Sequence, residues 1–344
     1  MDERKRQVIR SLHEASTRSF WQNNLYILLF FAVMGVSLVA WEMGYWPITL
    51  ACWALQAHIG HMNLIAFHEA SHYLLHPKLL LNEFNGMLIG SIILTPLSVY
   101  RYVHHQHHSY LGTRRDTELW PYVLPGTSRV LRILSAMGEL LVGFFYTPIV
   151  FVHGYLTADR MPKRLSRRIA AEYALCIAFW CVLSAAVTYL GVWEYFLVGY
   201  LVPTMIAGNL QSIRKFTEHM GMLGDDVPST TRTVVDPRLL GSLLSKSMMH
   251  IDFHGIHHRY ARIPQYNLPR ATTHVYAPSE LQEAIFPSYW SAMWDMFKSL
   301  GNPRVGRQWL EAPAESKDPA TSVKPRSVPR GPTQIERFEN AARS

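Results

Sequence analysis

Long stretches that carry almost no charge constrain the fold of this chain more than any other feature of its sequence. A helix that crosses a bilayer needs about 20 mostly apolar residues. Four segments meet this requirement, and they are Leu25–Trp46, Pro47–Phe67, Ile169–Trp193 and Tyr195–Ser212. We therefore predict an all-α, polytopic membrane protein with about four transmembrane helices.

Two further segments are apolar but less suited to crossing a membrane. Phe84–Tyr100 has 17 residues with Pro96 inside it, which is compatible with a short span, a re-entrant segment or a buried helix. Arg132–Leu156 contains Glu139, His153 and helix-breaking residues. We interpret this second segment as a helix that lies at the membrane interface or packs against the core.

Basic residues indicate how the spans are oriented. The chain has a net charge of +8, and many of its lysines and arginines lie next to the spans. They include Arg4, Lys5, Arg6, Arg10 and Arg18 before the first span, Lys163, Arg164, Arg167 and Arg168 before the third, and Arg214 and Lys215 after the fourth. Because basic residues accumulate in the cytoplasmic loops of membrane proteins, we expect the N-terminus in the cytoplasm. No basic patch is interleaved with base-stacking aromatic residues, so nucleic acid is not an expected partner.

Three histidine clusters fall on the same predicted cytoplasmic side. They are His68-Glu-Ala-Ser-His72, His104-His-Gln-His107-His108 and His254-Gly-Ile-His257-His258. Residues three or four positions apart share one face of a helix. A cytoplasmic helical cap could therefore deliver eight imidazoles, the commonest metal ligands, into one volume below the bilayer.

The number of imidazoles predicts two metal ions. One zinc ion takes four ligands, and a catalytic zinc usually takes three from the protein, so eight imidazoles would overfill a single site. Imidazole binds zinc, copper, iron and nickel, and ligand type alone does not choose among them. A redox metal fits better if the substrate is an inert hydrocarbon in the membrane.

The first cluster also supports a rival hypothesis. His68-Glu69-Ala-Ser-His72 satisfies the H-E-x-x-H pattern, in which two histidines bind zinc and the glutamate acts as the general base of a metalloprotease. This interpretation predicts a membrane zinc protease with about one zinc per chain. It leaves the histidines of the other two clusters without a role.

The clusters and their flanking spans resemble the membrane fatty acid desaturase superfamily, whose histidine boxes occur in this order. Residues 107–116 are similar to the sequence that follows the family's second box, and residues 253–269 to the third box and its proline-containing continuation. Arg214–His219 resembles the Glu-His that these proteins carry after the last span. The resemblance covers roughly residues 25–300.

The resemblance implies a centre of two iron ions that activates O2 as co-substrate and removes hydrogen from an unactivated C–H bond. The ligands that it implies are His68, His72, His104, His107, His108, His254, His257 and His258, with His219 as a ninth. No catalytic residue is expected beyond the metal centre. Glu69, Asp116 and His250 are expected to orient the ligands through hydrogen bonds.

The leading hypothesis is an oxidoreductase that introduces a C=C bond into a fatty acid or acyl-lipid. A hydroxylase or ketolase of a lipid, a carotenoid or another hydrophobic substrate would use the same di-iron site, and the sequence does not separate the two reactions. The chain has no His-Pro-Gly-Gly segment of a fused cytochrome b5 domain. Electrons are therefore expected from an external donor of the ferredoxin or cytochrome b5 type.

The composition divides the chain into three parts. The predicted divisions are a basic cytoplasmic segment at 1–24, the desaturase-like domain at 25–310 and a disordered tail at 311–344. The tail is rich in proline, serine and charged residues, a composition that buries too little apolar surface to fold alone.

Overall fold

The computed structural model describes residues 3–14, 16–158, 161–275 and 285–311. Within these ranges the chain is mostly helical, and two short strands, β1 (Thr233–Val234) and β2 (Ile285–Phe286), form a parallel pair. The predicted all-α class is confirmed. Apart from residue 311, the tail that we expected to be disordered lies outside the described residues.

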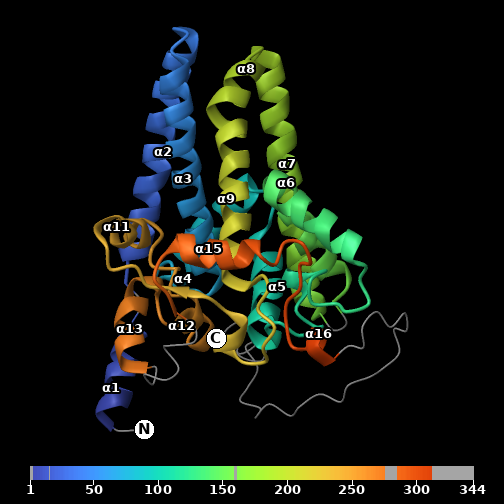
Figure 1. Cartoon of the computed structure of the whole chain (residues 1–344). Helices are drawn as coiled ribbons and strands as arrows, with labels where there is room; N and C mark the ends of the chain where they lie inside the picture. Colours follow the sequence, from blue (N-terminus) through green and yellow to red (C-terminus); the bar gives the residue numbers. More distant parts are fainter. Residues whose placement is uncertain (1–2, 15, 159–160, 276–284, 312–344) are drawn as a thin grey trace.

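Long helices run side by side above a cap of shorter ones (Figure 1). The first two, α2 (Arg18–Glu42) and α3 (Trp46–Ser71), form a hairpin. The next hairpin consists of α7 (Lys163–Leu190) and a second arm made of α8 (Trp193–Phe196), the π-helical turn η2 (Leu197–Leu201) and α9 (Val202–His219). Gly191 ends α7 with a φ of 68°, a left-handed conformation that glycine adopts without steric cost.

The outer faces of these helices are apolar. Leu28 on α2 is 68% exposed, and on α7 Val182 and Tyr189 are 70% and 90% exposed. Soluble proteins rarely leave large contiguous apolar patches in water. This part of the molecule is therefore suited to contact with lipid.

Four helical segments among the described residues are long and apolar enough to cross a membrane. They are α2, α6 (Arg129–Leu156), α7 and the arm from Trp193 to His219. The predicted number of spans is confirmed, but the set differs from the predicted one. By length and composition α6 qualifies, although we expected it at the interface or against the core, whereas α3 does not qualify.

Polar residues explain why α3 is less apolar than its neighbours. Gln56 Nε2 donates a hydrogen bond to Gly199 O at 2.9 Å, and His58 Nε2 lies 3.1 Å from Ser247 Oγ. A polar group in apolar surroundings needs such a partner. The polar side of α3 is thus directed into the bundle. These polar residues lower the mean hydropathy of α3 below that of its neighbours.

The helix α6 bends at Val142, where the backbone leaves the helical conformation. Asn209 of α9 satisfies the opened backbone, because its Oδ1 accepts from Gly143 N at 2.9 Å and its Nδ2 donates to Leu141 O at 3.1 Å. A side chain at Gly143 would place its Cβ 2.8 Å from Gly208 O. The two glycines therefore permit the close approach through which α9 supports the bend.

The segment 84–100 does not form one straight helix. Its residues belong to α4 (Leu79–Ile92) and α5 (Leu97–Tyr110), which meet at 97° in the manner of a broken span or a re-entrant loop. Pro96 stands immediately before α5, where its fixed φ and missing N–H suit the start of a helix. The bend allows α5, with the second histidine cluster, to pack against the end of α3 that carries the first.

The cap is assembled from short helices and the N-terminus. Its elements are α1 (Glu3–Leu12), η1 (Thr117–Leu119), α10 (Val227–Thr230), α11 (Leu239–Ser247), α12 (His254–Arg259), η3 (Gln265–Asn267), α13 (Leu268–Val275), α15 (Tyr289–Phe297) and α16 (Gln308–Glu311). Leu12 of α1 is fully buried in one apolar cluster with Ile256 and Leu268. The N-terminal segment thus packs beside the third histidine cluster, and the boundary expected after residue 24 falls inside α2.

Candidate metal centre

Nine histidines meet where the long helices join the cap. The first cluster lies at the end of α3, where His68 is helical and His72 is the C-cap residue. The second cluster lies on α5, the third on α12, and α9 ends at His219. All nine side chains that we predicted as ligands belong to closely spaced groups, and all are buried except His108, which is partly buried.

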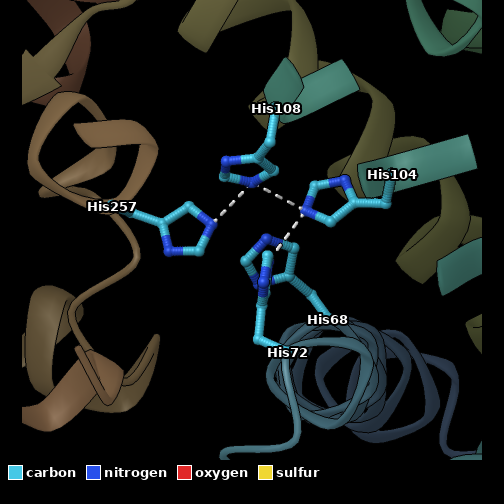
Figure 2. Close-up of side chains that lie close together, drawn as sticks. All are labelled: His68, His72, His104, His108 and His257. Atoms are coloured by element: carbon cyan, nitrogen blue, oxygen red, sulfur yellow. Dashed lines mark hydrogen bonds between the residues drawn. The ribbon is translucent and has the colours of Figure 1, made fainter. Parts of the chain in front are cut away.

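Five imidazoles form a first group (Figure 2). Its members come from α3, α5 and α12, and their ligand nitrogens all lie within 4.8 Å of one another: His68, His72, His104, His108 and His257. The Nε2 atoms of successive rings are close. They are 3.1 Å apart between His72 and His104, 3.1 Å between His104 and His108, and 3.1 Å between His108 and His257.

Four imidazoles and one carboxylate form a second group. It combines two sets of residues whose ligand atoms lie within 4.8 Å of one another. One set is His107, His219 and His258, the other is Glu218, His219 and His254, and His219 belongs to both. His254 Nε2 is 2.9 Å from His219 Nε2 and 3.0 Å from His258 Nε2. The rings of His108 and His258 stack at 4.2 Å, so the two groups are adjacent.

The hydrogen bonds of the rings determine which nitrogens can bind a metal. His104 Nδ1 lies 2.8 Å from Glu118 Oε2, His107 Nδ1 lies 2.9 Å from Asp116 Oδ2, and His219 Nδ1 lies 3.0 Å from the carbonyl oxygen of Thr230. Carbonyl oxygens and ionised carboxylates only accept hydrogen bonds, so Nδ1 carries the proton in these rings. In these three rings Nε2 is then unprotonated, and its lone pair is available to a metal ion.

Converging lone pairs fit a metal ion better than they fit hydrogen bonds. At a metal–nitrogen distance of about 2.0–2.1 Å, neighbouring imidazole nitrogens stand roughly 3 Å apart, which is the spacing found here. Burial lowers the pKa of His254, His257 and His258 well below the usual value for imidazole, so these rings are neutral. Each group therefore offers neutral nitrogen donors around one point.

Two of the three residues expected to orient the ligands lie beside the groups. Asp116 Oδ2 accepts from His107 Nδ1 and also from Gly112 N at 3.0 Å. Glu69 is one step removed, since its Oε1 accepts from the backbone N of Gln265 at 3.1 Å. The third, His250, has its hydrogen bond with Ser245 Oγ at 2.9 Å rather than with an imidazole of either group.

Sequence reasoning missed several partners of the ligands. Glu118 holds His104, and burial alone would raise the pKa of this carboxyl, but His104 and His107 outweigh burial and hold it well below its usual value. Glu218 Oε1 lies 3.4 Å from His254 Nδ1. Glu118 lies two residues after Asp116, and Glu218 lies immediately before His219. This closeness in sequence was the signal from which both partners could have been predicted.

Gln265 is another partner that the sequence did not indicate. Its side-chain Nε2 lies 2.9 Å from His68 Nδ1. Among the described residues its Oε1 has no hydrogen-bond partner, and a half-turn of the amide would bring that oxygen to accept a proton from Nδ1. Gln265 lies almost 200 residues from His68 in sequence, so no local pattern connects them.

A buried arginine joins the first cluster to the second. Arg101 lies one turn before His104 on α5, and it donates from Nε to Ser71 O at 3.1 Å and from Nη2 to Ala70 O at 3.0 Å. These carbonyls belong to the last turn of α3, beyond which no further helical N–H groups follow, and Ala70 O also accepts from Asn82 Nδ2 at 3.0 Å. Arg101 also pairs with Glu83 at 2.5 Å. It therefore sets the position of α3 against α5.

The match to a known family agrees with this geometry. The model of the fatty acid desaturase family matches residues 44–290, a range that includes all nine histidines. The chain belongs to the fatty acid desaturase family. It is accordingly an oxidoreductase and, with its apolar helices, a multi-pass membrane protein.

Individual members of the family are distant in sequence. An sn-1 acyl-lipid omega-3 desaturase (ferredoxin) from Synechocystis is 23% identical over 292 residues, which is 75% of this chain and 78% of that protein. A probable fatty acid desaturase from Sorghum bicolor is 24% identical, over 76% of this chain and 71% of its own length. A chloroplastic omega-3 fatty acid desaturase from Glycine max is 24% identical, over 73% and 60%.

The site also accounts for the H-E-x-x-H pattern within the family. A zinc protease would use His68 and His72 as a pair with Glu69 directed at a bound water. Here the two imidazoles belong to a group with His104, His108 and His257, and Glu69 Oε1 is engaged by the backbone of Gln265. The pattern is thus part of a larger histidine assembly.

Proposed function

We propose that this chain is an O2-dependent di-iron oxidoreductase of the membrane that introduces a C=C bond into an acyl chain. The observation that carries the proposal is the division of nine imidazoles into two adjacent groups with facing Nε2 atoms. Two groups support two ions, and imidazole is a suitable ligand for iron. When bound, the iron pair would supply the activation of O2 that hydrogen removal from a methylene group requires.

The protein's own residues would hold and orient this centre. Glu118, Asp116 and the Thr230 carbonyl fix three rings through Nδ1, an arrangement that raises ligand basicity and sets ring orientation. Burial of eight of the nine side chains, with His108 partly buried, keeps bulk water away, which protects reactive species from side reactions.

The relatives and a cavity support a lipid substrate and an external donor. The name of the Synechocystis relative contains both acyl-lipid and ferredoxin. In this chain a cavity with mainly apolar walls reaches Tyr100 and Glu118 beside the first group. The basic residues next to the spans support a cytoplasmic position for the N-terminus and the histidines, where a ferredoxin or a cytochrome b5-type protein would deliver electrons.

Metal analysis and lipid profiling test the proposal together. The purified protein should hold about two iron ions per chain, and a heterologous host should gain an unsaturated acyl product only in the presence of O2. His104→Ala, His107→Ala and His258→Ala should abolish the product and lower the iron content. His13→Ala, outside both groups, is the matched control and should retain both.

Two results would redirect the assignment. Activity that survives the combined change of all three histidines would contradict a histidine-bound centre. Hydroxylated or keto products in place of an alkene would assign the chain to the hydroxylases or ketolases, which begin with the same hydrogen abstraction.

A further inference from the structure

The cavity beside the metal centre has two chemically different parts. It lies among α2, α3, α4, α6 and α9, and most of its wall is apolar. Representative wall residues are Ile27, Phe30, Leu64, Ile92, Phe144 and Pro148. This part suits a hydrocarbon.

The other part is a polar floor, which we define as Asn63, Glu118, Glu139, Gln211 and Lys215. All five residues line the same cavity. Lys215 forms an ion pair with Glu139, whose Oε2 accepts a hydrogen bond from Tyr122 OH at 3.1 Å. Glu139 is fully buried and only 12% of the Lys215 side chain is exposed, so the charges lie inside the protein.

The polar floor lies next to the metal centre. Glu118 belongs to the floor and also holds His104 at 2.8 Å. Lys215 precedes His219 by four residues on α9, and residues with this spacing share one face of a helix. Tyr100, which also lines the cavity, stacks on His104 with 5.3 Å between ring centres. A molecule in the cavity would therefore place the segment near the floor closest to the metals.

The floor has hydrogen-bonding capacity that the described protein groups do not use. An ammonium group has three N–H donors, and the salt-bridge partner of Lys215 within the described chain is Glu139. Asn63 Oδ1 is buried and has no hydrogen-bond partner among the described residues. An unbroken methylene chain against this floor would exclude water without replacing its hydrogen bonds, which is unfavourable.

We propose that the polar floor binds a hydroxyl or carbonyl oxygen that an otherwise apolar substrate carries close to the carbon facing the metal centre. The substrate class is thus a long-chain lipid that already bears one neutral oxygen function along its chain. A neutral group is favoured over a carboxylate because Glu139 neutralises Lys215 and Glu118 adds a second negative charge. The inference rests on the proposed function in one respect, the identity of the metal centre that the floor adjoins.

Binding to the full-length protein tests the proposal without requiring turnover. The probes are octadecane, which has no oxygen, and the positional isomers of octadecanol, measured by native mass spectrometry of the protein in detergent. At least one isomer should bind about tenfold more tightly than octadecane, the ratio that one hydrogen bond to a charged group supports. The double variant Lys215→Met with Glu139→Gln removes both charges. It should bind all probes about equally, so that the preference is lost.

Two further variants separate recognition from a general effect on the fold. Ile92→Ala changes the apolar wall and should weaken all probes by the same factor, leaving their ratio intact. Asn63→Leu leaves the ion pair in place and should reduce the preference by about threefold, as expected for one neutral hydrogen bond. It serves as the deciding variant if thermal unfolding shows that the double variant does not fold.

The outcomes distinguish this inference from the proposed function. Equal binding of all probes, absence of binding, or an unchanged preference in the folded variants would overturn the assignment of the floor and indicate that water fills it. A wild-type protein with two irons but no preference would overturn the floor alone. A protein with the preference but without iron would overturn the di-iron function and leave the floor assigned.

Discussion

The two imidazole groups use the same helices in opposite ways. On α5, His104 and His108 belong to the first group and His107 to the second; on α12, His254 and His258 belong to the second and His257 to the first. An α-helix turns by about 100° per residue. The fourth residue after a given position is therefore rotated from it by about 40° in one direction, and the third residue by about 60° in the opposite direction. Each helix therefore directs a pair of rings to one group and a single ring to the other.

The long helices, in contrast, serve one group each. The end of α3 contributes only to the first group, through His68 and His72, and the end of α9 only to the second, through Glu218 and His219. The first group has five imidazoles, whereas the second has four and a carboxylate. A change on α5 or α12 therefore affects both groups, whereas a change at the end of α3 or α9 directly affects only one.

Removal of a ligand from α9 should have the largest effect. His219→Ala leaves three imidazoles in the second group, and we expect bound iron to fall from about two to about one per chain. Activity should drop by at least about 100-fold, because even the loss of a residue that supports a ligand costs 10- to 100-fold. Elemental analysis and product assays measure both quantities.

His72→Ala is the matched change on the α3 side. It leaves four imidazoles in the first group, so that more iron should remain bound than in His219→Ala. If either variant loses both iron ions, the proposed independence of the two groups is wrong.

The next largest effect should come from the contact between α3 and α5. Arg101→Met removes the donors to Ser71 O and Ala70 O and breaks a buried ion pair with Glu83. Such a loss costs about 3 kcal/mol, which thermal or denaturant unfolding would detect. Because only the first group includes residues from α3, iron loss should be confined to one ion per chain.

An exposed arginine provides the control for this prediction. Arg307 pairs with Asp225 at the surface, where their side chains are 53% and 47% exposed. Arg307→Met should change stability by less than about 1 kcal/mol. A change as large as that of Arg101→Met would show that loss of positive charge, rather than the helix contact, is responsible.

Replacement of a carboxylate that accepts a hydrogen bond from one imidazole should have an intermediate effect on iron affinity. The effect should be confined to the group that contains this imidazole. Asp116→Asn weakens the support of His107 in the second group, and Glu118→Gln that of His104 in the first. We expect iron affinity to fall by about 10- to 100-fold in each case, with the shape of the side chain preserved. Competition with a chelator would show two phases, and the variants should accelerate different ones; acceleration of the same phase by both would refute the assignment.

The smallest effect should come from a neutral partner. Gln265→Ala removes the amide beside His68 Nδ1. One neutral hydrogen bond contributes about 0.5–1.5 kcal/mol, so iron affinity of the first group should fall by less than about tenfold. If Gln265→Ala lowered iron affinity as much as Glu118→Gln, the charge of the hydrogen-bond partner would not decide how strongly it supports its histidine.

Some features of the site could be predicted from local sequence, while others depended on contacts between distant segments. Spacings of three and four residues identified the clusters, because helical periodicity is a local property. The partners Gln265 and Thr230 were not predictable, since they lie 197 and 11 residues from the rings that they contact. The membership of α3 and α6 among the apolar helices also differed from expectation. The helix α6 is long and apolar enough by composition despite Glu139 and His153, whereas α3 is not, since it carries polar residues such as Gln56 and His58.

The sequence by itself determined the helical class, the number of apolar helices and the nine histidines that meet at the centre. Each follows from composition or spacing within one segment, which a single helix translates directly into length and face. Only the tertiary structure decided how the nine rings divide into two groups, which acids and amides hold them, and that a polar floor adjoins them. These features depend on the angles at which helices cross and bend, and those angles are set by packing between residues far apart in the chain.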